Sequence, residues 1–319
     1  MDSLDKVLLL ELSTDCRVSF SHLSRKFKIS PNSVKNRVQK LIEREIILGF
    51  ITELNPLLFN ANTTLISFQF KNKINNEILN KIGNHQLVYG AGVSLDSGFA
   101  TAFYRTNKEL SHLNDFFYSF EDLKTLELYP VLPPLSVNDS PPQGHISDLQ
   151  PIDWLILYHI RNNGRIPLSK LAKKTQVTVK TLKKRIESMK KRNFITLTIR
   201  LNPGAISKGI MFIIIVELSK ITHQIRFEIE KKIREIRPDN FWVSWQVVDR
   251  PKILLAFQAE SASEVNAVQY EISKLIPDNI SISTVIGGEM RYFPDFTDEL
   301  LEKKKNEGWF STKQWERHI

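Results

Sequence analysis

The sequence lacks the features that several classes of protein require. Its 319 residues contain one cysteine, Cys16, so no disulfide can form within the chain. The most apolar run, residues 211–216, is far too short to cross a membrane, and the residues after Met1 carry no basic leader. No glycine-rich phosphate loop, paired carboxylates or Cys/His ligand spacing appears. We therefore expect a cytoplasmic protein that is not an enzyme and that binds no membrane, metal or cofactor.

Positive charge is plentiful, but it is confined to two segments. The whole chain carries a net charge of +9. Residues 165–200 hold twelve Lys or Arg against one acid, and residues 17–52 hold eight against two, so the remainder of the chain is acidic. A surface that binds a polyanion has this uneven distribution. The alternative is that lysine runs such as Lys173-Lys174 are only solvated helix faces.

One pattern occurs twice in the chain. Residues 4–56 return as residues 152–203, and Asp5 and Asp153 stand at the same offset of 148 as Arg37 and Arg185. A repeat period of 148 residues exceeds the period of about 20 to 50 residues that is typical of solenoid proteins. The pattern therefore predicts a duplicated domain pair.

Each copy begins with three short helical patterns and a β-prone run. The third helix of copy one has the clearest start, because Ser30 is suited to the N-cap and Pro31 to the first helical position. Its inward stripe is Val34, Val38 and Leu41, and copy two repeats it with Leu182, Ile186 and Met189 after the cap Thr178. Runs 46–51 and 194–199 suit a small wing. The pattern predicts a winged helix-turn-helix, whose third helix enters a DNA major groove.

The outward faces of these two helices supply the candidate DNA contacts. Asparagine and glutamine can form bidentate bonds to adenine, whereas lysine favours guanine or phosphate, so the two halves of the site are expected to differ. We expect Arg37 and Arg185 to bind DNA phosphates, with a structural ion pair as the alternative role. The full set is Asn32, Ser33, Lys35, Asn36, Arg37, Gln39, Lys40, Lys180, Thr181, Lys183, Lys184, Arg185 and Lys190.

The segments that follow each helix-turn-helix predict a second kind of domain. Strands are expected at 63–71, 87–94, 98–105 and 125–129 with helices at 74–84 and 107–120, then strands at 211–218, 241–248, 252–259 and 281–286 with helices at 223–237 and 263–276. Both sets have the β-α-β-β-α-β order of a ferredoxin-like fold. Residues 130–151 contain six prolines and are expected to continue no helix or sheet, so they predict a linker. After Gly287-Gly288, a short amphipathic helix is expected to pack on the second sheet, or alternatively to bind a partner.

We therefore expect an α+β protein built as a tandem repeat of a winged helix-turn-helix followed by a ferredoxin-like βαββαβ domain. The expected boundaries are 1–58 and 61–130 for the first pair, 131–150 for the linker, 151–205 and 208–288 for the second pair, and 289–319 for a C-terminal tail.

The helix-turn-helix of copy one contains the motifs Asp15-Cys16-Arg17-Val18-Ser19, Ile29-Ser30, Ile46-Ile47-x-Gly49-Phe50 and Leu54-Asn55-Pro56. In these motifs the chain resembles the Lrp/AsnC family of transcription regulators, and the resemblance covers both copies, residues 1–288. It implies a ferredoxin-like domain that dimerises and often senses amino acids. Copy two departs from the pattern at Trp154 and at 196–198, where the turn glycine of the family is missing.

The sheets depart further from the family pattern. Members of the family carry a Gly-x-Tyr/Phe-Asp turn between the second and third strands, and the counterparts here keep Asp96 and Asp249 without the glycine and the aromatic residue. Asp96 and Asp249 are thus the candidate effector contacts. A small-molecule effector and homo-oligomerisation through the sheets are left open.

A tandem chain can supply both recognition helices as a covalent pseudo-dimer, which predicts a sequence-specific regulator that binds double-stranded DNA. The same two-domain architecture also resembles sirohaem decarboxylases, which implies His, Arg and Tyr-Asn-x-Trp residues along the second and third strands. The candidates here are Tyr89, Tyr104-Arg105, Trp242, Trp245 and Arg250, and those strands hold no histidine. A sequence-tolerant, chromatin-like DNA-binding protein is the third hypothesis.

Overall fold

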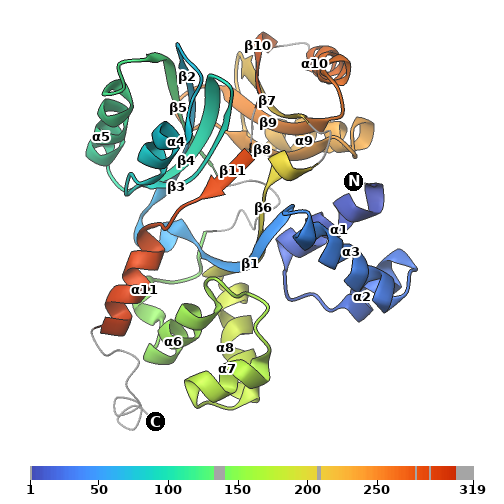
Figure 1. The fold of residues 1–319 in the computed structure, drawn as a ribbon, viewed down its shortest axis with the longest axis vertical. Coiled ribbons are helices and arrows are strands. Elements are labelled where there is room, and N and C mark those ends of the chain that lie inside the picture. Colours follow the sequence, from blue (N-terminus) through green and yellow to red (C-terminus); the bar gives the residue numbers. More distant parts are fainter. Residues whose placement is uncertain (1, 133–140, 207–209, 277–278, 287–288, 307–319) are drawn as a thin grey trace. The chain divides into compact units, whose positions relative to one another are not determined.

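The computed structural model describes residues 2–132, 141–206, 210–276, 279–286 and 289–306, and the chain divides into two compact units (Figure 1). The helical unit comprises Asp2–Asn60, Ser140–Leu201 and Pro294–Ile319. The sheet unit comprises Ala61–Asp139 and Asn202–Phe293. No helix within the described ranges is long and apolar enough to cross a membrane.

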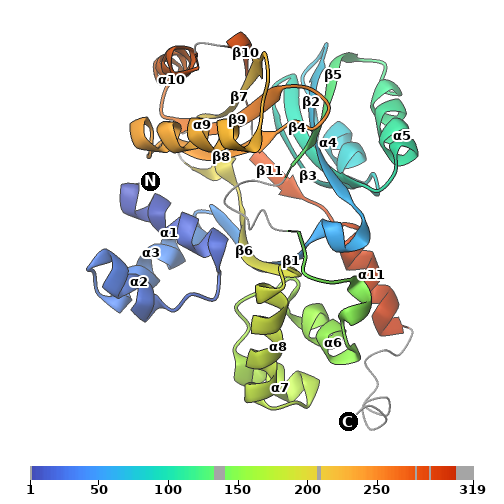
Figure 2. The same cartoon turned by 180° about the vertical axis from the view of Figure 1, so that it is seen from behind.

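The helical unit contains the two predicted helix-turn-helix domains. The elements of the first are α1 (Ser3–Thr14), α2 (Phe20–Phe27), α3 (Pro31–Glu43), β1 (Ile47–Leu54) and the 3-10 turn η1 (Pro56–Phe59). The second follows the 3-10 turn η2 (Ile146–Asp148) and consists of α6 (Pro151–Ile160), α7 (Leu168–Thr175), α8 (Val179–Lys191) and β6 (Ile195–Leu201). Figure 2 shows α6, α7 and α8 from behind, with α11 (Phe296–Asn306) beside α6.

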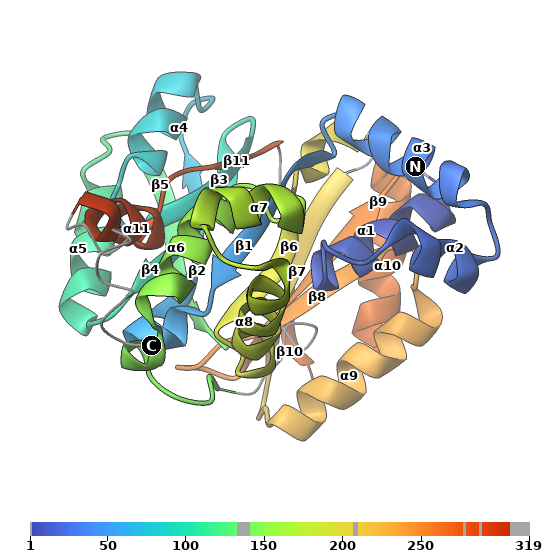
Figure 3. The same ribbon diagram turned by 90° about the horizontal axis from the view of Figure 1, so that it is seen from below.

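The β-prone runs after the two domains form one shared ribbon. Each domain contributes a single strand, and β1 and β6 pair antiparallel in the register Phe50↔Ile199, Ile51↔Thr198 and Thr52↔Leu197. Figure 3 shows the two strands running side by side between the helix-turn-helix domains. The wing is therefore built from both copies of the repeat, because neither run has a partner strand within its own domain.

The sheet unit confirms the ferredoxin-like arrangement twice. The first domain consists of β2 (Asn62–Phe70), α4 (Asn76–Gly83), β3 (Val88–Ser94), β4 (Ser97–Tyr104), α5 (Asn107–Tyr118) and β5 (Leu123–Val131). After the 3-10 turn η3 (Pro203–Ala205), the second consists of β7 (Ile210–Leu218), α9 (His223–Ile236), β8 (Phe241–Gln246), β9 (Lys252–Ala259), α10 (Ala262–Leu275) and β10 (Asn279–Ile286). The strand orders β3-β4-β2-β5 and β8-β9-β7-β10 are equivalent.

The apolar run at 211–216 is explained by burial on both faces of β7. Phe212 and Ile214 pack with the helices of their own domain, whereas Ile215 packs in a second core with Leu65 of β2 and Val247. The two sheets thus face each other across this second core. A strand with two buried faces has no need of alternating polar residues.

The linker prediction was wrong at its first residues, because β5 continues through Pro130 to Val131. Proline cannot donate to a ladder, but β5 is an edge strand, so the missing N–H costs no strand pairing. The Pro130 carbonyl accepts from the Val248 amide at 2.8 Å, and the Leu132 amide donates to Gln246. Residues 133–140 of the predicted linker lie outside the described residues.

The prediction that the tail packs on the second sheet was also wrong. A short strand, β11 (Glu289–Tyr292), adds to the free edge of β3 in the first sheet. The predicted amphipathic helix forms as α11, but it contacts α6 of the second helix-turn-helix domain. Residues 307–319 of the predicted tail, with the aromatic residues Trp309, Phe310 and Trp315, lie outside the described residues.

Candidate nucleic-acid interface

The third helix of each helix-turn-helix is fixed by its cap and its apolar stripe, as predicted. The Ser30 hydroxyl accepts from the Ser33 amide at 3.0 Å, and the Thr178 hydroxyl accepts from the Thr181 amide at 3.1 Å. The inward residues Val34, Val38 and Leu41 are buried, and so are Leu182, Ile186 and Met189. Lys28 and Gln176 adopt the left-handed conformation at equivalent positions and turn the chain into these helices.

The outward face of α3 is polar and open to solvent. Its exposed residues are Asn32, Lys35, Asn36, Gln39 and Lys40, and Ser33 and Arg37 are half-buried. The Gln39 amide donates to Glu43 at 3.1 Å. Asn32 and Asn36 are among the residues that line a polar hollow of about 690 Å³ between α3 and the start of α1. Both asparagines are therefore accessible from solvent.

The outward face of α8 differs in composition and charge. Lys180, Thr181, Lys183 and Lys184 are exposed, and within the described structure no ion pair engages the three lysines. Lys190 is half-buried because its ammonium group pairs with Asp15 of the first domain at 2.7 Å and with Glu187 at 3.5 Å. Lys190 therefore joins the two domains as well as extending the basic face.

Arg37 and Arg185 form the same ion pair in both copies of the repeat. Arg37 pairs with Asp5 at 2.7 Å and with Asp2 at 2.6 Å, and Arg185 pairs with Asp153 at 3.2 Å. Hydrogen bonds to the two aspartates raise the pKa of Arg37, and burial raises the pKa of Asp153. The repeated Asp and Arg thus brace the first helix against the third. The arginine side chains remain 31% and 39% exposed, and a phosphate contact by that exposed part stays a prediction.

The two domains contact each other through reciprocal hydrogen bonds. The Cys16 amide donates to the Leu197 carbonyl at 2.8 Å, and the equivalent Gly164 amide donates to the Phe50 carbonyl at 2.7 Å. Arg165 and Arg17 likewise donate to carbonyls of the opposite domain, at Cys16 and at Ile166. Such reciprocal contacts are typical of a two-fold interface, in which residue i of one half contacts residue j of the other and residue j of the first contacts residue i of the second. The helical unit is thus a pseudo-symmetric pair within one chain.

The interface between the two helix-turn-helix domains, here called the joint, leaves no space for a side chain at Gly164. A Cβ atom at Gly164 would lie 2.7 Å from the Ile51 carbonyl oxygen and 2.9 Å from the Cys16 sulfur. Cys16 is fully buried, and burial raises the pKa of its thiol to about 12. The interface at this point therefore has no room for a side chain larger than that of glycine.

The other candidate residues lie in the sheet unit. Asp96 is in the β3–β4 turn, where its carboxylate accepts from the Gln69 amide at 3.1 Å, and Asp249 follows β8 and lies 3.5 Å from Arg250. Tyr89 stacks on Phe103 with centroids 4.2 Å apart, and Arg105 pairs with Glu109.

Arg250 and Trp245 lie at the face between the two sheets. Arg250 donates to the Leu128 carbonyl at 2.6 Å and covers the ring of Tyr129, while Trp245 packs against the core between the sheets. Tyr104 and Trp242 lie half-buried on β4 and β8. No group of three His, Cys, Asp or Glu side chains in the described part of the chain could hold a metal ion.

Sequence reasoning did not find several residues that hold the helix-turn-helix pair together. Asp2 and Asp15 supply carboxylates to Arg37 and Lys190, and Arg161 pairs with Asp295 and Asp298 from the tail. Among these residues, only Asp295 and Asp298 stand in a local sequence pattern, because Asp295-Phe296-Thr297-Asp298 has the spacing of a capping box. The other pairs join residues that are far apart in the sequence.

Comparison with known proteins agrees with the helix-turn-helix assignment. Residues 1–42 match the AsnC-type helix-turn-helix domain, and residues 149–196 match the winged helix-turn-helix DNA-binding domain. The HTH-type transcriptional regulator LrpA of Pyrococcus horikoshii is 39% identical over 56 residues, which are 18% of this chain and 40% of the relative. The HTH-type transcriptional regulator Ptr1 of Methanocaldococcus jannaschii is 39% identical over 56 residues, 18% of this chain and 38% of the relative. The chain thus spans less than half the length of these curated relatives.

The whole fold has a counterpart among solved structures. The crystal structure of the siroheme decarboxylase NirDL matches with a TM-score of 0.56 at 14% identity, over 95% of this chain and 98% of that chain. At this identity the likeness concerns the fold alone. The chain therefore carries two helix-turn-helix DNA-binding domains, the first of AsnC type, within an α+β fold that also occurs in that enzyme structure.

Proposed function

We propose that the protein is a sequence-specific transcription regulator of Lrp/AsnC type that presents α3 and α8 to one DNA duplex. The observation that carries this proposal is the pseudo-symmetric joint, which fixes two solvent-facing third helices in one chain. Regulators that bind DNA as dimers read two half-sites with two such helices. A covalent pair needs no second chain to do the same.

The two helices are chemically unequal, and the proposed site is asymmetric. Asn32, Asn36 and Gln39 on α3 offer the bidentate amides that read adenine. At the equivalent positions of α8 stand Lys180, Lys184 and Glu187, so this helix offers mainly positive charge. One half of the site is thus read by base contacts and the other is held mostly through phosphates or guanine.

The test is selection of binding sites from random duplex DNA, followed by affinity measurements on the selected and on scrambled DNA across a salt series. We expect an asymmetric motif bound about 10³-fold or more above scrambled DNA. Asn36→Ala should relax the sequence preference. Lys183→Ala should instead weaken binding to all sequences and make the slope of log affinity against log salt concentration shallower by about one. Lys108→Ala, an exposed lysine on α5, is the control that removes the same charge elsewhere. Equal affinity for selected and scrambled DNA would instead support a chromatin-like protein held by phosphates.

A second candidate function rests on the match of the whole fold to a siroheme decarboxylase structure. Its candidate residues here are engaged in other contacts, since Tyr89 stacks on Phe103, Arg105 pairs with Glu109 and Arg250 binds a carbonyl. A visible absorption spectrum after incubation with an iron tetrapyrrole tests this candidate. A shifted and saturable absorption band, together with no DNA binding at moderate salt, would contradict the regulator proposal and favour the enzyme proposal.

A small-molecule effector would bind in the sheet unit, and Asp96 and Asp249 are the residues we propose to contact it. Both carboxylates lie in turns that follow the second strand of a ferredoxin-like domain. We further propose that any homo-oligomer forms through the ferredoxin-like domains. Calorimetric titration with the amino acids, followed by Asp96→Asn and Asp249→Asn variants of any responder, tests the effector proposal.

A further inference from the structure

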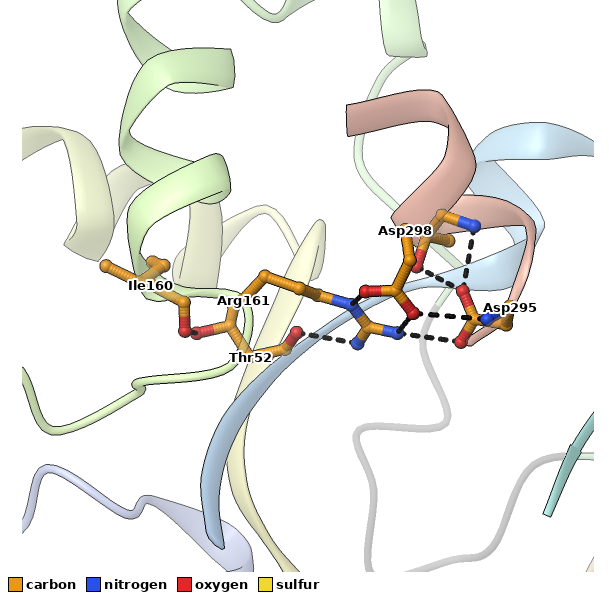
Figure 4. A network of polar contacts seen from close by, with 6 residues as sticks. Thr52, Ile160, Arg161, Asp295 and Asp298 are labelled. Atoms are coloured by element: carbon orange, nitrogen blue, oxygen red, sulfur yellow. Dashed lines mark hydrogen bonds and ion pairs between the residues drawn. The ribbon is translucent and has the colours of Figure 1, made fainter. Parts of the chain in front are cut away.

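A buried guanidinium joins three segments of the helical unit. Arg161 directly follows α6 and is 4% exposed, and its side chain reaches both β1 of the first helix-turn-helix domain and the start of α11 (Figure 4). A buried charge is costly unless opposite charges and hydrogen bonds surround it. The partners of Arg161 therefore show which segments must stay together.

Toward the tail, Arg161 meets two carboxylates. Its Nη2 atom lies 2.7 Å from Asp295, and its Nε atom lies 3.0 Å from Asp298. The same carboxylates cap α11, because Asp295 accepts from the Thr297 amide at 2.7 Å while Asp298 accepts from the Asp295 amide at 3.1 Å. Burial alone would lower the pKa of Arg161, but the two aspartates raise it. The two carboxylates that cap α11 are therefore the same ones that pair with Arg161.

Toward the first domain, the end of α6 uses every polar group of Thr52. The Thr52 amide donates to the Arg161 carbonyl at 2.9 Å, and its hydroxyl donates to the Ile160 carbonyl at 3.0 Å. The Thr52 carbonyl accepts from Arg161 Nη1 at 2.9 Å. Thr52 is fully buried and lies in the second half of β1. The side chain of Arg161 thus binds the tail and the first domain at once.

Within the described residues, α11 packs on α6 of the second domain. Lys304 lies over the ring of Trp154 at 5.8 Å, and Lys305 lies over Tyr158 at 5.0 Å. At the repeat offset, the first domain has Lys6, Leu10 and Ser13 in place of Trp154, Tyr158 and Arg161. The departure of copy two at Trp154 thus lies on the helix that the tail contacts.

We propose that α11 is a clamp that, through Arg161, holds the second helix-turn-helix domain in one orientation relative to the first and thereby fixes the half-site spacing that the protein accepts. This inference rests on the proposed DNA-binding function. Two linked binding modules gain affinity only when their geometry lets both engage at once. Without Asp295 and Asp298 the guanidinium would turn to solvent, and its bond to Thr52 would be lost. Residues of the tail would then control spacing without touching DNA.

The test compares the Asp295→Asn/Asp298→Asn variant with Glu302→Gln. The second variant removes the exposed ion pair Lys305–Glu302 from the same helix and leaves Arg161 untouched, so it is the matched control. The first readout needs no DNA. Amide exchange in the double variant should be about tenfold or more faster at the Thr52 and Gly164 amides, which cross the joint, but unchanged within α3. Asp298→Asn alone should give a smaller change and serves if the double variant does not fold.

The second readout is affinity for duplexes in which the two halves of the selected site are moved apart by inserted base pairs. The wild-type protein and Glu302→Gln should bind one spacing best, whereas the double variant should lose about tenfold at that spacing and bind the others nearly as well. A duplex with one half-site should bind all three proteins equally. Unchanged exchange and unchanged spacing preference would overturn the clamp. Faster exchange without DNA binding by any of the proteins would overturn the regulator but retain the clamp as a structural joint.

Discussion

Gly164→Ala should weaken the joint between the two helix-turn-helix domains. The added methyl group would lie 2.7 Å from the Ile51 carbonyl oxygen and 2.9 Å from the Cys16 sulfur. The oxygen belongs to β1, which is held along its length by pairing with β6, so it cannot retreat without disturbing the ladder. Forcing an extra methyl group into a well-packed site typically costs about 1–3 kcal/mol. For a unit of this size, that loss corresponds to a melting temperature lower by roughly 3–10 °C.

Gly49→Ala is the matched control, because nothing lies within 4 Å of a Cβ atom at Gly49 on the same ribbon. Thermal unfolding of the full chain, followed by circular dichroism at fixed pH and salt, measures both variants. Gly164→Ala/Cys16→Ala should recover only part of the loss, since the Ile51 oxygen remains in the way. If Gly164→Ala and Gly49→Ala melted together with the wild-type protein, the close joint between the domains would be refuted.

Asp153 and Cys16 are buried and His85 is half-buried, and each of these three groups leads to a prediction. Arg185→Gln should cost about 1–3 kcal/mol in urea unfolding, because Asp153 would stay buried without a cation, whereas Arg105→Gln in an exposed pair should cost less than about 1 kcal/mol. Burial lowers the pKa of His85, so the unfolded chain takes up a proton first and stability should fall as the pH drops below about 6.5; His85→Gln should flatten that decline. Cys16, with a pKa raised to about 12, should resist iodoacetamide at pH 8 until the chain unfolds, and rapid labelling of the native protein would contradict its burial.

The sequence predicted those elements whose pattern is local. Caps and periodic apolar residues determine the third helices, so Ser30 with Val34, Val38 and Leu41 could be assigned without a structure. The ferredoxin-like strands were found for the same reason, although Pro130 was taken to end the sheet when it only marks an edge strand. Local patterns thus give the elements but not their neighbours in space.

What the sequence did not predict depends on contacts between distant residues. The β1–β6 ribbon, the addition of β11 to the first sheet and the docking of α11 on α6 each join segments more than 100 residues apart. The candidate site shows the same limit. The predicted outward residues are exposed, except for Ser33, Arg37, Arg185 and Lys190, which are half-buried. The ion pairs of Arg37 depend on two aspartates at the start of α1 that no local pattern pointed to.

The two copies share the residues that stabilise the fold, but they differ in the residues that α3 and α8 expose to solvent. The Asp–Arg pair and the reciprocal amide bonds recur in both copies, whereas Asn32 and Asn36 of α3 are replaced by Lys180 and Lys184 of α8. If the two helices divide base reading and phosphate binding between them, Asn32→Lys/Asn36→Lys should convert the first helix to the second type.

The conversion has a quantitative signature. Two new phosphate contacts should steepen the slope of log affinity against log salt by about 0.9 each, and the loss of adenine contacts should remove about 1–3 kcal/mol of discrimination for each base no longer read. Asn80→Lys/Asn107→Lys adds the same charge on exposed positions of α4 and α5 and should alter neither quantity appreciably. A variant that bound more tightly at low salt but kept its preference for the selected site would show that α3 does not read bases, and the asymmetric assignment would then fail.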